Sequence, residues 1–129
     1  MNYLADTVTL VRHFSGVGKI ALTAKTILKE AEEGKHQIFI SIVSLFEVMY
    51  LAERKRIKIS LKSTIASIQK KSCYSIIDLN KEIVLLAETI PFYELHDRLI
   101  LATSKYLEAD ILSSDIRFDE IKGLTRIWK

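Results

Sequence analysis

Four acidic side chains stand in apolar surroundings, where an ionised carboxylate is costly unless it is paired or bound to a cation. Each lies beside or within a short apolar segment, and the four residues are Asp6, Glu47, Asp97 and Asp115. If they converge, a hard divalent cation such as Mg²⁺ or Mn²⁺ would relieve their repulsion, because such ions prefer oxygen ligands. The set therefore indicates metal-assisted phosphoryl chemistry, with hydrolysis of a phosphodiester as the leading case.

Each of these acids also has a simpler interpretation. Asp6 fits a helix N-cap, Ser44 and Glu47 have the spacing of a capping box, Asp97 fits a cap at a helix start, and Asp115 fits a turn after a strand. Taken together, however, all four occupy the same position relative to the predicted sheet. That shared placement favours one common site over four separate structural roles.

The elements that must position these acids follow from hydrophobic periodicity. Strands are expected at residues 3–5, 37–41, 74–79, 111–113 and 124–128, and helices at 7–14, 20–33, 44–54, 61–71, 81–89 and 96–107. Strands that alternate with helices predict an α/β fold with a mainly parallel central sheet. Ligands of such sheets bind beyond the carboxyl ends of the strands, which is where the acids are expected to meet.

The overall composition fits an ordinary globular domain. The 129 residues suit one domain over positions 1–129, and the formal net charge is +3. Cys73 is the single cysteine, so neither an internal disulfide nor a cysteine-ligated zinc site is expected. The N-terminus does not have the pattern of a signal peptide, and the longest apolar run is too short to span a bilayer. A cytoplasmic protein without a membrane partner is the expectation.

The segments around the four acids resemble those of PIN domains and, within that family, of the VapC-type toxins of type II toxin–antitoxin pairs. The matching residues are Tyr3-Leu4-Ala5-Asp6-Thr7, Ile40-Ser41-Ile42-Val43-Ser44-Leu45-Phe46-Glu47, His96-Asp97-Arg98-Leu99-Ile100-Leu101-Ala102-Thr103 and Leu112-Ser113-Ser114-Asp115. The third segment is the most specific of them. The resemblance extends over nearly the whole chain in both order and spacing.

This resemblance implies a three-layer α/β/α PIN-like fold and a metal-dependent ribonuclease. It maps the family's acidic site onto Asp6, Glu47, Asp97 and Asp115, with Ser113 in a supporting position. For Thr7, a supporting role and a capping role are equal alternatives. The resemblance also implies a homodimer and a cognate antitoxin protein that holds the toxin inactive. The expected reaction is the hydrolysis of an RNA phosphodiester with Mg²⁺ or Mn²⁺.

In that expected reaction, Asp6, Asp97 and Asp115 ligate one or two metal ions. Glu47 completes the ligand shell or orients the attacking water. The water attacks phosphorus in line, while the metal stabilises charge on the non-bridging oxygens.

Basic and aromatic side chains are the candidates for contacts with RNA. Seven basic residues and one acid lie between Glu53 and Lys71, which predicts either a solvated face or a track for phosphates. The candidate RNA-binding residues are Arg54, Lys55, Arg56, Lys58 and Arg98. For Arg98, an ion pair with a nearby carboxylate is an equal alternative. For Phe92, Tyr93 and Trp128 we favour packing in the core, and base stacking is the alternative. His96 is expected to have a structural role at a helix start rather than to donate to a phosphate.

Other functional classes fit less well. A receiver-like phosphotransfer domain needs paired acids after the first strand, and Asp6 stands alone. A haloacid-dehalogenase-like phosphatase needs Asp-x-Asp there, and Val8 occupies the second position. The open alternative is a non-catalytic PIN-like module that acts through a protein or RNA partner.

Overall fold

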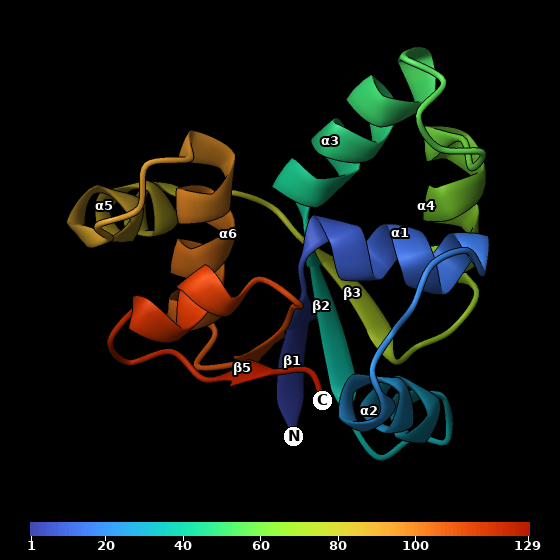
Figure 1. The fold of residues 1–129 in the computed structure, drawn as a ribbon, viewed down its shortest axis with the longest axis horizontal. Coiled ribbons are helices and arrows are strands. Elements are labelled where there is room, and N and C mark those ends of the chain that lie inside the picture. The colour runs from blue at the N-terminus through green and yellow to red at the C-terminus, as the bar shows by residue number, and fades with distance from the viewer.

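The computed structural model describes residues 1–129 and contains one five-stranded sheet in the order β3-β2-β1-β4-β5, with every neighbouring pair parallel (Figure 1). The strands are β1 (Asn2–Ala5), β2 (Gln37–Ser41), β3 (Tyr74–Ile77), β4 (Asp110–Leu112) and β5 (Arg126–Ile127). The helices are α1 (Thr7–Ser15), α2 (Leu22–Glu32), α3 (Ile42–Glu53), α4 (Leu61–Gln69), α5 (Lys81–Thr89) and α6 (Leu95–Tyr106), with a short 3₁₀ helix η1 (Ile116–Glu120).

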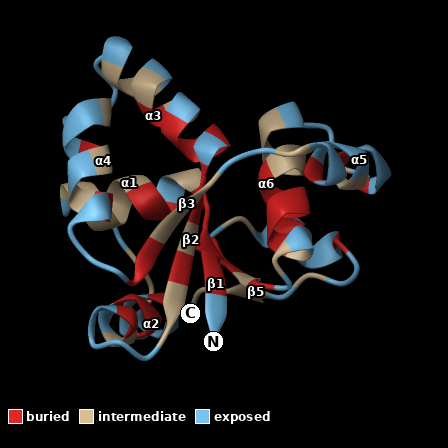
Figure 2. Cartoon of the chain, turned by 180° about the vertical axis from the view of Figure 1, so that it is seen from behind, coloured by how far each residue is buried: buried red, intermediate tan, exposed pale blue.

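Helices cover both faces of the sheet, because successive strand residues point to opposite sides. In β1, Tyr3 and Ala5 belong to a core cluster with α1, α2 and α4, whereas Leu4 belongs to a second cluster with α5 and α6. Helix α3 contributes Leu45 to the first cluster and Val43 to the second. Buried residues accordingly fill the sheet and the inner faces of the helices (Figure 2). The predicted three-layer α/β/α architecture is confirmed.

Most predicted elements are found close to their expected bounds, and α5 has them to the residue, with Asn80 as its N-cap. Three details differ. Helix α3 begins at Ile42 and is capped by Ser41, so Ser44 lies inside the helix and the capping box expected for Ser44 and Glu47 is wrong. The helix η1 lacks a hydrophobic repeat long enough to predict it, and β5 is limited to two residues.

None of the helices has both the length and the apolar character needed to cross a lipid bilayer. Cys73 is buried and free. Strand β1 lies at the centre of the sheet, between β2 and β4. The residue that follows β1 is thus held from both sides.

Candidate active site

Asp6 follows β1 directly and is 7% exposed. Its side chain caps α1 by accepting a hydrogen bond from the Thr9 amide at 3.0 Å, while its own amide donates to the Leu112 carbonyl of β4 at 3.2 Å. The capping role and a place at the carboxyl edge of the sheet are therefore both found. Burial raises the pKa of Asp6, whereas interactions with Ser113 and Thr9 oppose that rise.

Glu47 is held from α1 by a hydroxyl group. The Thr7 hydroxyl donates to Glu47 Oε1, and it lies 2.9 Å from the buried Ser44 hydroxyl. The second carboxylate oxygen of Glu47, Oε2, lies 3.3 Å from Nδ1 of His96, which enters from α6. Glu47 therefore joins α1, α3 and α6 through side-chain contacts, and its position is fixed by partners that lie far away in sequence.

Asp97 occupies the first turn of α6, three residues after the N-cap position Glu94, so the cap expected at Asp97 is wrong. Its pKa is raised to about 6, first by burial and then by the negative charges of neighbouring acids. Those acids are Glu47, Glu94, Asp115 and Asp6. Asp97 is thus the carboxylate that interacts with each of the other three predicted site acids.

Asp115 caps η1 and pairs with a cation from the same short helix. Arg117 donates from Nε to Oδ1 of Asp115 at 3.0 Å and from Nη2 to Oδ2 at 2.7 Å, which is a bidentate geometry. The Asp115 amide donates to the buried Ser113 hydroxyl at 3.0 Å. The turn interpretation and the site interpretation of Asp115 are therefore compatible, since its carboxylate also acts on Asp97.

The carboxylates supply a donor set suited to a hard divalent cation, because every predicted ligand atom is an oxygen. The charge that accumulates around Asp97 also fits a cation, since a positive ion there would reverse the effect that raises its pKa. No group of three or more His, Cys, Asp or Glu side chains is already arranged as a metal site. Binding would therefore draw the acids together and compete with Arg117 for Asp115.

The raised pKa of Asp97 gives a stability prediction for the metal-free protein. The folded state holds the Asp97 proton more tightly than the unfolded chain, whose ordinary value is 3.8. The stabilising contribution of this group is therefore complete below pH 4 and is lost as the pH rises through about 6. At pH 7, Asp97→Asn should raise the free energy of unfolding by about 1–2 kcal/mol, and by less at pH 4.5. Urea unfolding in EDTA at both pH values measures this.

The matched control is Asp78→Asn, because Asp78 is an exposed acid in the loop that follows β3. This substitution should leave the urea midpoint nearly unchanged at both pH values. A stabilisation by Asp97→Asn that is equally large at pH 4.5 and pH 7 would contradict the interpretation, because it would not arise from ionisation.

Four of the five predicted RNA-binding residues lie in the segment that follows α3. Arg54, Lys55, Arg56 and Lys58 are exposed at and beyond the C-terminal end of α3, whereas Glu47 lies in the middle of that helix. Arg56 and Lys58 line a hollow of about 380 Å³, and the Arg54 guanidinium lies 4.8 Å from the ring centroid of Tyr50. The Arg98 guanidinium instead donates two hydrogen bonds to the Ala87 carbonyl, at 3.1 and 3.2 Å. It therefore ties α6 to α5 and pairs with no carboxylate.

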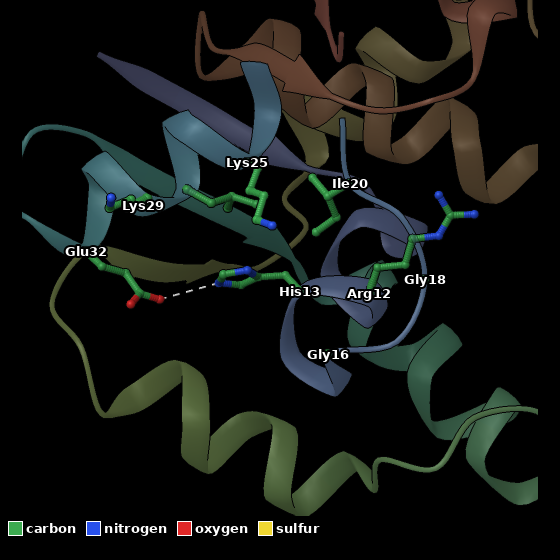
Figure 3. Close-up of a pocket in the computed structure, with 9 residues that line it drawn as sticks. Arg12, His13, Gly16, Gly18, Ile20, Lys25, Lys29 and Glu32 are labelled. Atoms are coloured by element: carbon green, nitrogen blue, oxygen red, sulfur yellow. Dashed lines mark ion pairs between the residues drawn. The ribbon is translucent and has the colours of Figure 1, made fainter. Parts of the chain in front are cut away.

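A second basic hollow, of about 410 Å³, lies at the C-terminal end of α1 (Figure 3). Asp6 caps the other end of that helix. The titratable lining residues of the hollow are Arg12, His13, Lys25, Lys29 and Glu32. Glu32 is already engaged by Lys71 and Tyr74, and it lies 3.4 Å from His13. Burial lowers the pKa of His13, so its ring adds little positive charge. This hollow is separate from the acids and was not expected from the sequence.

Three side chains near the acids have contacts or exposure that the sequence pattern did not predict. His96 lies in the first turn of α6, as expected, and its contact with Glu47 was not predicted. Tyr93 is 75% exposed, so the core position expected for it is wrong. Arg117 had no predicted role, because nothing in its spacing marks it as the partner of Asp115. Such contacts depend on η1 and on the loop before α6, whose paths the sequence pattern does not define.

The comparisons with known proteins agree with the observed fold. The family model described as PIN domain matches residues 3–124. The VapBC2 complex from Rickettsia felis, bound to a DNA fragment from its promoter, includes a chain with a TM-score of 0.77 and 19% identity, at 100% coverage of both chains. A chain of DNA-bound VapBC from Salmonella typhimurium has a TM-score of 0.72 and 14% identity, and the match covers 98% of this chain and 97% of that one. A chain of a toxin–antitoxin complex from Klebsiella pneumoniae has a TM-score of 0.65 and 24% identity, and the match covers 95% of each chain. No curated protein sequence matches.

Proposed function

Since the chain belongs to the PIN domain family, we propose that it is a metal-dependent endoribonuclease and the toxin component of a type II toxin–antitoxin pair. The observation that supports this proposal is the raised pKa of Asp97, which burial raises first and which the charges of four neighbouring acids, Glu47, Glu94, Asp115 and Asp6, raise further. Charge of one sign is gathered there without an equivalent number of cations. A site that binds Mg²⁺ or Mn²⁺ accounts for that arrangement.

The residues of the proposed site would have different roles in the reaction. Asp6, Asp97 and Asp115 would hold the cation, which supplies charge stabilisation at the phosphate and lowers the pKa of water. Glu47, oriented by the Thr7 hydroxyl, would hold the attacking water in line with the bond that breaks. Ser113 would support the site through its contacts with Asp6 and Asp115. Water is added across one P–O bond, leaving a phosphate monoester and a hydroxyl group.

A protein partner is part of the same proposal. The similar solved structures are described as VapBC or toxin–antitoxin complexes, and this chain would likewise bind a cognate antitoxin in the cytoplasm. Large apolar side chains are exposed on α1 and α3, among them Val8, Phe46 and Tyr50. A second exposed pair, Val84 and Leu85, lies on α5 and would suit a homodimer. Light scattering of the purified chain, alone and with the product of a neighbouring small reading frame, measures both associations.

The decisive experiment is a cleavage assay with the purified chain. Single-stranded and structured RNAs are incubated with Mg²⁺ or Mn²⁺, and the products are separated on a denaturing gel. Discrete fragments with phosphate monoester ends support the proposal. If no RNA is cut under any of these conditions, the alternative gains support, namely a non-catalytic module that acts through a protein or RNA partner.

The exposed basic segment after α3 gives a prediction about RNA affinity. Replacing Arg56 and Lys58 by Ala should weaken the binding of RNA by about tenfold at low salt, because two phosphate contacts are lost. The loss should be similar for every RNA sequence, and the slope of log affinity against log salt should fall by about 1–2. Fluorescence anisotropy over a salt series measures both. Replacing Lys122 and Lys129 by Ala is the control, and an equal loss in that variant would contradict a specific track.

A further inference from the structure

Two aromatic side chains, Phe92 and Tyr93, lie near the acids, and packing in the core does not account for the exposed ring of Tyr93. The rings of Phe92 and Tyr93 are stacked, with centroids 5.2 Å apart and planes 12° apart. Phe92 is anchored by an edge contact with the buried ring of Phe118, at 5.4 Å. Tyr93 nevertheless keeps 75% of its surface accessible. A flat aromatic surface is thus fixed from below and open to solvent.

A cation connects this aromatic pair to the acidic site. The Arg117 guanidinium lies 5.3 Å from the centroid of each ring, which is within the range of cation–π contacts. The same guanidinium pairs with Asp115 through two hydrogen bonds. Tyr93 also lies only four residues before Asp97, in the loop that leads into α6. The aromatic surface and the acids are therefore separated by one side chain.

The chemistry of this surface suits an unpaired nucleobase. Single-stranded RNA is bound by stacking of its bases on aromatic side chains and on arginine planes, and every base offers such a face. A paired base has no free face for this contact, so the surface favours unpaired RNA over a duplex. Arg117 adds a positive charge where the phosphate beside that base would lie.

We propose that Tyr93, backed by Phe92 and Arg117, forms a stacking subsite for the unpaired nucleobase beside the phosphate that is cut. This inference rests on the proposed ribonuclease function and specifies its substrate as single-stranded at that position. Stacking would place the adjacent phosphate near Asp97 and Asp115. The subsite therefore acts in substrate binding, and the acids act in the reaction.

Binding is measured in the Asp6→Asn background, so that the RNA stays intact. The probe is a fluorescent ten-nucleotide adenosine RNA, and fluorescence anisotropy gives its affinity. Tyr93→Ala should weaken binding by about tenfold, whereas Tyr93→Phe and Tyr93→Trp should retain it, because both keep the ring. The slope against salt should stay unchanged, since no phosphate contact is lost. Tyr106→Ala is the matched control, because Tyr106 is a 43% exposed tyrosine at the other end of α6.

An RNA of the same length that lacks its bases separates stacking from a general loss of affinity. Tyr93→Ala should make no difference on this probe. The proposal is overturned if Tyr93→Ala binds the adenosine RNA as tightly as its parent, if the abasic probe shows the same loss, or if no variant binds RNA. It is also overturned if Tyr93→Ala weakens only the binding of a protein partner.

The same variants distinguish a failure of the subsite from a failure of the proposed function. If the wild-type chain cuts RNA and Tyr93→Ala leaves KM and kcat unchanged, the subsite fails and the nuclease stands. If the wild-type chain cuts nothing while binding still depends on Tyr93 and on the bases, the nuclease fails and the stacking subsite stands. If both stand, Tyr93→Ala raises KM by about tenfold with kcat nearly unchanged.

Discussion

Asp6→Asn should reduce RNA cleavage by at least about 100-fold while the protein stays folded. The substitution removes the negative charge that the cation requires and keeps the shape of the side chain. Asn is as good an N-cap as Asp, so its amide oxygen can still accept from the Thr9 amide. Because burial already raises the pKa of Asp6, a neutral side chain at this position adds no desolvation cost. Initial rates from denaturing gels, together with the thermal midpoint of unfolding, measure the two effects.

The choice of substitution matters, because Asp6→Ala would remove the cap of α1 and cost about 1 kcal/mol of stability. A loss of activity in that variant could then result either from reduced stability or from the missing carboxylate. Asp119→Asn provides the control for losing one acid, since Asp119 is exposed and pairs with Arg126. This control should cut RNA at close to the wild-type rate. A rate for Asp6→Asn above one tenth of the wild-type rate would remove Asp6 from the site.

Removal of divalent cations should abolish cleavage by the wild-type chain, and Mg²⁺ or Mn²⁺ should restore it. The physical reason is the group of carboxylates around Asp97, which repel one another unless a cation lies among them. A bound ion stabilises the folded state only, so saturating Mn²⁺ should raise the melting temperature of the wild-type chain by several degrees. Dialysis against EDTA followed by readdition of each ion, with rate and melting temperature as readouts, measures this.

The site variants separate specific binding from general effects of the ions. Asp6→Asn and Asp97→Asn should lose most of the Mn²⁺-dependent rise in melting temperature, whereas Asp78→Asn should keep it. Cleavage that persists in EDTA would refute the metal-dependent nuclease, whatever the variants show. A rise in melting temperature that is equal in all variants would place the ion outside the carboxylate site.

Much of the fold could be predicted from the sequence because its signals are local. Asn80 and the periodic residues after it define α5, and Asp6 marks the end of β1, because each effect operates within one helical turn or one strand. The start of α3 was misplaced by two residues because Ser41 and Ser44 are equally good caps in a linear sequence. Ser41 both ends β2 and caps α3, and the sequence pattern does not show that one residue has both roles.

The parts of the site that could not be predicted depend on contacts between distant residues. Thr7 and Glu47 are 40 positions apart, and His96 meets Glu47 across 49 positions. Periodicity carries no information on which polar side chains meet across an interface between helices. The exposure of Tyr93 was not predictable for the same reason: its aromatic ring favours burial, but the path of the loop before α6 leaves it exposed to solvent. Asp6 and Asp115 were predictable in position, since they follow β1 and β4 and the carboxyl ends of parallel strands share one edge.

The order of the strands gives the site one rigid side and one yielding side. Asp6 follows the central strand β1, whereas Asp115 follows β4, whose outer neighbour is the two-residue strand β5. A short edge strand has few bonds to break, so local opening of the native state begins there at low free energy. Ser113 is tied to that edge, since its amide donates to the Ile127 carbonyl at 3.2 Å. Under the proposed function, the adjustment to an ion and a substrate would therefore fall on Asp115 and η1, and Asp6 would keep its position.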